Sequence, residues 1–198
     1  MDSNKPTIEI CFNFDLDNGV TSPEQWYLSA CELIYVQKQL ENNIYEILEN
    51  PKIEPIYLKQ EYIDISLRPI DALGGISRTY MYLSGIIFEN LTKAIIIQKF
   101  PKKLSEITNA PKGHDLTYLI DLCGFNLTKK EHETFERIST YVVWAGRYSH
   151  PKRGKNKKAK NGAIKFETED IDFINEWVSK LNDIANHSVY LERTKQKL

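Results

Sequence analysis

The stretch DALGGISRTYMYLSGIIFENLTKAIIIQK, Asp71–Lys99, decides the fold, because apolar residues recur through it at three- and four-residue steps. The stripe consists of Leu73, Ile76, Tyr80, Leu83, Ile87, Leu91, Ala94 and Ile95. Such spacing predicts one long amphipathic helix, which ends before Pro101. Gly74, Gly75 and Gly85 lie along it, where a small residue lets another helix approach closely at a cost of about 1 kcal/mol relative to Ala.

Similar stripes predict helices over about residues 22–48, 115–123, 128–146 and 168–184. Their start signals are Ser22 with Pro23, Asp115, Thr128 with Glu131, and Thr168. Residues 52–70 are either a helix or an irregular extended segment. We therefore expect an all-α fold, an antiparallel bundle of four to five helices joined by short connections.

The 198 residues are enough for one domain with its own core, and no internal repeat divides the chain. Residues 1–21 are predicted to be an N-terminal arm, in which alternating Ile and Phe residues are typical of a short strand. Residues 22–198 are then a single helical domain, with a basic loop at 151–165.

The composition, with 41% hydrophobic and 27% charged residues, is that of an ordinary soluble protein. Three cysteines without CxxC spacing argue against a disulfide framework or a zinc site and favour the reducing cytoplasm. The four histidines are scattered, so we predict neither a metal nor another cofactor. The longest apolar stretch, Tyr82–Ile97, is too polar and too short for a bilayer span, so no membrane association is expected.

The net charge of −1 conceals a concentrated positive segment. From Arg137 to Lys165 there are nine basic residues and no acidic one, which leaves 26 − 9 = 17 basic against 27 acidic residues elsewhere. The densest part consists of Lys152, Arg153, Lys155, Lys157, Lys158 and Lys160. Flexible cations of this kind either bind phosphates without reading sequence or form a solvated loop. No aromatic residue is interleaved for base stacking.

Three fragments stand in a characteristic order: LSGIIFENLTKAII on the long helix, KGHDLTYLI after a loop, and WAGRYSHP at a later helix end. Together they resemble the HEPN superfamily of helical domains over roughly residues 24–185. The matching positions are Glu89, Lys93 and Ala94 in the first fragment, His114, Asp115 and Leu116 in the second, and Arg147 and Tyr148 in the third.

This resemblance implies a metal-independent endoribonuclease, active as a homodimer with two Arg–His sets facing each other, in a stress, defence or toxin–antitoxin setting. It also implies an alternative, because other HEPN-like domains bind nucleotides or protein partners and cleave nothing. A third possibility is a subunit of a larger assembly, to which the arm of residues 1–21 adds a strand.

RNA cleavage without a metal uses the neighbouring 2′-hydroxyl as nucleophile and needs a proton-transfer group and a cation. Arg147 is suited to bind the phosphate, and His150 or Tyr148 to assist proton transfer. The alternative is that Arg147 meets the negative end of a helix dipole while His150 is solvated.

Five further residues are candidates for a supporting role. Glu89 and Lys93, with Asn90 between them, either form a weak surface pair four residues apart or lie beneath the Arg147 site and orient it. His114 and Asp115 are either a structural histidine with a helix cap or an acid–base pair.

Overall fold

The computed structural model describes residues 22–50, 56–59, 64–67, 69–108, 112–145 and 165–195, and the side chains within 22–50, 72–108, 112–143 and 165–190. Over these residues the chain is an all-α bundle of six α-helices with one short β-hairpin. The predicted arm strand within 1–21, and the basic loop of 151–165 up to Lys165, lie outside the described residues.

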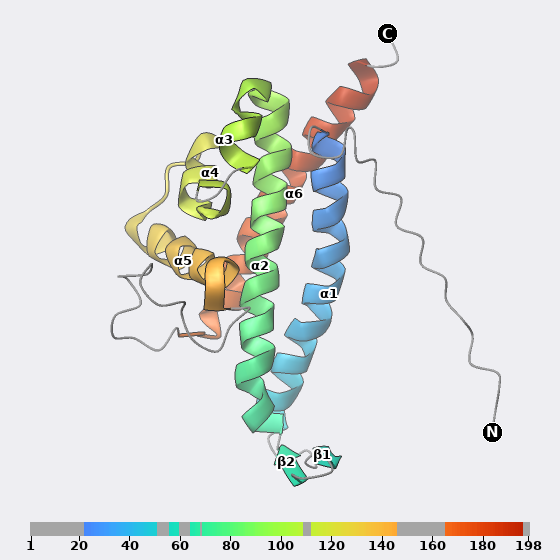
Figure 1. Cartoon of the computed structure of the whole chain (residues 1–198), viewed down its shortest axis with the longest axis vertical. Coiled ribbons are helices and arrows are strands. Elements are labelled where there is room, and N and C mark those ends of the chain that lie inside the picture. Colours follow the sequence, from blue (N-terminus) through green and yellow to red (C-terminus); the bar gives the residue numbers. More distant parts are fainter. Residues whose placement is uncertain are drawn as a thin grey trace, which may run out of the picture.

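Helix α2 (Pro69–Lys99) is the axis of the bundle, with the other helices packed around it (Figure 1). Every residue from Ile87 to Ile97 is buried, so this half of α2 has no face toward solvent. A helix buried all round is expected to be apolar all round, and Glu89 and Lys93 are exceptions in its middle. No helix in the described ranges combines the length and apolarity needed to cross a bilayer.

Helix α1 (Pro23–Glu49) runs antiparallel to α2. Gln37 Nε2 donates to Ser84 Oγ at 2.5 Å, and nearer the start of α1 the Trp26 ring lies beneath the Lys93 ammonium. Ser22 occupies the predicted N-cap position of α1, but its side chain makes no capping hydrogen bond.

Helix α6 (Glu169–Lys195) packs against both α1 and α2 and completes a layer of three long helices. Lys38 Nζ donates to Asn175 Oδ1 at 2.7 Å, and Asn175 Nδ2 donates to Glu41 Oε1 at 3.1 Å. These bonds fix α6 along α1 by polar contacts, whereas its contact with α2 is mainly apolar.

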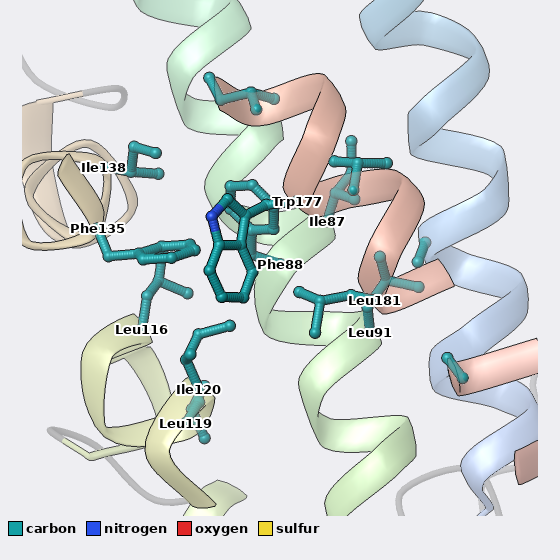
Figure 2. Packing of buried hydrophobic residues seen from close by; sticks show 14 of the residues in the cluster. Ile87, Phe88, Leu91, Leu116, Leu119, Ile120, Phe135, Ile138, Trp177 and Leu181 are labelled. Atoms are coloured by element: carbon teal, nitrogen blue, oxygen red, sulfur yellow. The ribbon is translucent and has the colours of Figure 1, made fainter. Parts of the chain in front are cut away.

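Three shorter helices cover the side of α2 that faces away from α1: α3 (Leu104–Thr108), α4 (Leu116–Leu122) and α5 (Lys129–Thr140) (Figure 1). The Phe135 ring of α5 lies beside Phe88 and Trp177 in the core (Figure 2). It meets these two rings and Phe173 edge to face, with centroids 5.1–5.2 Å apart. Each such pair contributes about 0.5–1.5 kcal/mol beyond its buried area, so Phe135 ties α5 to both α2 and α6.

The predicted start signals of the short helices α4 and α5 are confirmed. The Asp115 side chain accepts a hydrogen bond from Tyr118 N at the start of α4. Thr128 and Glu131 form a reciprocal capping box at the start of α5. Gly124 has a φ of +94°, a left-handed conformation in which glycine ends α4 without steric cost.

The ambiguous segment of residues 52–70 contains an antiparallel hairpin of β1 (Ile56–Lys59) and β2 (Asp64–Leu67). Its register pairs Ile56 with Leu67 and Leu58 with Ile65, so apolar residues occupy paired positions in the two strands. The hairpin lies at the end of the α1–α2 pair, where the chain reverses direction (Figure 1).

Gly85 permits a close contact between α2 and the end of α5. Helix α5 continues into a π-helical turn, η3 (Tyr141–Ala145), which packs on α2. A Cβ at Gly85 would overlap Val142 Cγ2 and would lie 3.2 Å from Ile138 Cγ2. The predicted role of small residues in close helix approach therefore holds for Gly85, whereas Gly74 and Gly75 face open space.

We expect Gly85→Ala to lower the free energy of unfolding by about 1–3 kcal/mol, because the added methyl group overfills the contact between α2 and η3. Gly75→Ala, in the same helix, should instead raise it by up to about 1 kcal/mol, since Ala is the better helix former. Urea unfolding followed by circular dichroism measures both. Equal stabilisation by the two substitutions would contradict the close contact at Gly85.

Candidate functional site: a buried carboxylate between a lysine and a histidine

Glu89, on α2, is the middle member of a series of three side chains in contact, Lys93, Glu89 and His114. Its Oε1 accepts a hydrogen bond from Lys93 Nζ at 2.6 Å, and its Oε2 lies 2.8 Å from His114 Nδ1. The Glu89 side chain is 7% exposed and that of Lys93 is 3% exposed. The alternative of a weak surface pair is therefore wrong, because neither group retains its hydration.

Lys93 is held on its other side by an aromatic ring from α1. Its Nζ lies 4.7 Å from the centroid of the Trp26 ring, a cation–π arrangement that partly replaces lost hydration. Trp26 is one of the apolar residues of the predicted helix over residues 22–48. Its contact with Lys93 follows from the alignment of α1 beside α2, which the spacing within either helix does not specify.

His114 reaches Glu89 from the 3₁₀ turn η2 (Lys112–His114), which precedes α4. Its side chain is 37% exposed, so the imidazole joins the buried carboxylate to the surface. A Cβ at Gly113 would lie 2.6 Å from the Ile107 carbonyl oxygen, so only glycine lets this turn approach α3 closely. Asp115 on the other side of His114 is fixed as the α4 cap. His114 is thus positioned by backbone constraints before and after it.

The predicted supporting residues are brought together only in part. Asp115 is not the acid partner of His114: its Oδ1 accepts from Thr117 Oγ1 at 2.7 Å and from Tyr118 N at 3.2 Å. The acid partner is Glu89, 25 residues earlier in the chain. Asn90 is buried at the neighbouring position of α2, outside the series of bonds from Lys93 through Glu89 to His114.

A second cluster holds the η2 turn against α3. Tyr118 Oη donates a short hydrogen bond to Glu106 Oε1, and Lys112 Nζ donates to the same oxygen at 2.9 Å. The hydrogen bond from Tyr118, followed by that from Lys112, lowers the pKa of Glu106 from 4.5 to about 2. Glu106 is therefore ionised throughout the neutral range, and it holds Lys112 before His114 and Tyr118 after it.

The end of α5 lies close to this site. Leu116 N, two residues after His114, donates to Ser139 Oγ at 3.1 Å. Val142 packs on Gly85, which precedes Glu89 by four residues, or about 6 Å along α2. The fold therefore brings α5 and η3 beside the turn of α2 that carries Glu89.

Two members of the basic segment are neutralised by acids. Arg137 forms a short ion pair with Asp170, and Lys165 Nζ lies 3.0 Å from Glu167 Oε1. The other seven basic residues are Arg147 and the six predicted phosphate ligands between Lys152 and Lys160. These seven residues, and the candidates Tyr148 and His150, lie outside the described residues. In the part of the chain that is described, no three His, Cys, Asp or Glu side chains are arranged to hold a metal ion.

Comparisons with protein-family models, with curated proteins and with solved structures find no match to this chain. The resemblance to HEPN domains therefore stays a prediction from the three sequence fragments. What the site does has to be argued from its own residues.

We expect Lys93→Met and Glu89→Met to lower the free energy of unfolding by about 3–5 kcal/mol each, because each leaves a buried charge without its partner. The double variant Glu89→Met/Lys93→Met should recover most of that loss, since no unpaired charge remains. Chemical denaturation of wild type, the two single variants and the double variant gives the coupling free energy between Glu89 and Lys93.

The matched control is Lys129→Met, which breaks another pair four residues apart, with Glu133 at 3.9 Å on the exposed side of α5. It should leave stability unchanged within error. Comparable effects of Lys93→Met and Lys129→Met would mean that the Glu89 pair is solvated.

Tyr118→Phe removes the largest cause of the low Glu106 pKa, which should rise from about 2 toward 4.5. A depressed carboxylate pKa stabilises the fold above pH 4.5, and this contribution is lost as the pH falls toward 2. Carboxyl carbon NMR titration measures the change directly. An unaltered Glu106 titration would show that the Tyr118 bond is absent in solution.

Proposed function

We propose that this protein is a HEPN-like endoribonuclease that binds RNA through its basic segment and cleaves it without a metal ion. The observation that supports this best is the position of the Glu89–His114 pair beside the end of α5. The chain leaves η3 at Ala145, two residues before Arg147. An imidazole held by a carboxylate thus lies beside the helix that precedes the most basic stretch in the sequence.

The chemistry of RNA cleavage accounts for the types of residue involved. Phosphate binding needs cations, which Arg147 and the lysine-rich stretch after it supply. Proton transfer near neutral pH needs a group such as imidazole, and the sequence places His150 close to Arg147 while the fold adds His114. We propose that a second copy of the chain completes the site, and that a reducing cytoplasm in a stress, defence or toxin–antitoxin setting is its context.

A second candidate is a non-catalytic HEPN-like module that binds a protein partner. The observation that favours it is an apolar patch on α1, where Leu28 and Tyr35 are exposed seven residues apart and therefore on one face. Tyr35 is 71% exposed, and aromatic side chains are enriched where proteins bind one another. This candidate predicts that RNA stays intact and that His150→Ala is tolerated.

The deciding experiment incubates the purified protein with total RNA and EDTA and compares wild type with Arg147→Ala and His150→Ala. We expect wild type to cleave the RNA. Arg147→Ala should reduce the cleavage rate by about 100-fold or more, because it removes charge stabilisation of the transition state, and His150→Ala should also reduce the rate. Binding should weaken steeply with added salt, because phosphate contacts release counterions.

Lys129→Ala is the control, since it removes one exposed cation from the far end of α5 and should cleave as wild type does. Intact RNA in every lane would remove the enzyme and favour the interaction module.

A further inference from the structure

We propose that His114 is the general base of the site, that Nε2 is its reactive atom, and that Glu89 positions it. This inference rests on the proposed function, because it assigns a proton-transfer residue to that reaction. It goes beyond the prediction that Arg147 and His150 form the site. The spacing of the motifs does not indicate that His114 pairs with Glu89, and Asp115, next to His114 in the sequence, suggests a different partner.

The tautomer of neutral His114 follows from the hydrogen bonds of Glu89. A carboxylate that accepts a bond from the Lys93 ammonium is ionised and has no proton to donate. Neutral imidazole carries its proton on one nitrogen only, so Nδ1, 2.8 Å from Glu89 Oε2, must be the N–H donor. Nε2 then has a free lone pair and is ready to accept a proton.

The exposed part of His114 lies away from Glu89. The ring is anchored through Nδ1 to a carboxylate that is 7% exposed, while the His114 side chain as a whole is 37% exposed. The accessible part of the ring is therefore its far side, where Nε2 lies. A histidine that served only to satisfy a buried carboxylate would not need to bring its second nitrogen to the surface.

Both members of the Glu89–His114 pair are held by their neighbours. Glu89 is fixed by Lys93, and Lys93 by the Trp26 ring, so the carboxylate has little freedom to turn away. The turn that carries His114 is fixed by the close approach at Gly113. A base held in one orientation by its neighbours is what a precisely aligned proton transfer requires.

In the reaction, Nε2 of His114 accepts the proton of an RNA 2′-hydroxyl, and the 2′-oxygen forms a new bond to the adjacent phosphorus. The bond from phosphorus to the 5′-oxygen breaks, and that oxygen takes a proton from solvent. The products are a 2′,3′-cyclic phosphate and a 5′-hydroxyl end, with no change of oxidation state. Glu89 stabilises the imidazolium that forms, as the acidic member of a catalytic triad does.

Charged groups face His114 from α2 and from its own loop. On α2 they are Glu89 and Lys93, which together are neutral and hydrogen bonded. In its own loop they are Lys112, which pairs with Glu106, and Asp115, whose carboxylate caps α4. Each positive group near the ring is therefore matched by a negative one.

The test combines long-range proton–nitrogen NMR of the histidines with RNA cleavage and RNA binding. It compares wild type, His114→Ala, the charge-balanced Glu89→Met/Lys93→Met, and the control His187→Ala, which removes an exposed histidine on α6. The double variant removes the carboxylate without leaving a buried charge, so it should fold even where Glu89→Met alone does not.

We expect the Nδ1–H form for neutral His114 in wild type and its loss in the double variant. Cleavage should fall about 100-fold or more in His114→Ala and more than about tenfold in the double variant. RNA affinity should stay as in wild type, and His187→Ala should cleave normally. Cyclic phosphate ends should appear on the product.

Two results would overturn the assignment while leaving the proposed function intact: wild-type rates in His114→Ala, or a wild-type His114 that carries its neutral proton on Nε2. If wild type neither binds nor cleaves RNA, the proposed function itself fails, and the role of His114 as its base fails with it.

Discussion

The rest of the structure depends on one constraint, the complete enclosure of α2 between Ile87 and Ile97. A helix with no solvent-facing side must satisfy every polar group it carries through its neighbours. Lys93 does so through Glu89 and Trp26, and Glu89 through Lys93 and His114. These contacts fix where α1 and the η2 turn can pack, so the polar residues of the central helix determine the register of the surrounding elements.

Much of the fold is predictable from the sequence, because local rules determine it. The apolar stripes identify the long helices, and Asp115, Thr128 and Gly124 mark ends that depend only on nearby backbone groups. The β1–β2 hairpin is missed, because two strands of four residues between prolines carry too little periodicity to be distinguished from an irregular segment.

The sequence predicts which residues belong to the site but not which of them pair with one another. The three HEPN-like fragments point to Glu89, Lys93 and His114, but sequence adjacency suggests the wrong carboxylate for His114. The choice between Asp115 and Glu89 is made by the close approach of η2 to α2, which depends on tertiary packing. Trp26 has no signal at all in the sequence beyond its apolar stripe, because its role depends on how α1 is aligned with α2.

The enclosed ion pair also constrains how this sequence can evolve. Replacing either Glu89 or Lys93 alone leaves an unpaired charge in the interior, whereas replacing both by neutral residues does not. Lineages descended from this chain must therefore pass through a poorly folded intermediate to abandon the pair, unless both codons change together. Among its descendants the two positions should be either both charged or both neutral, and a sequence with only one of the two charges should carry a compensating change nearby.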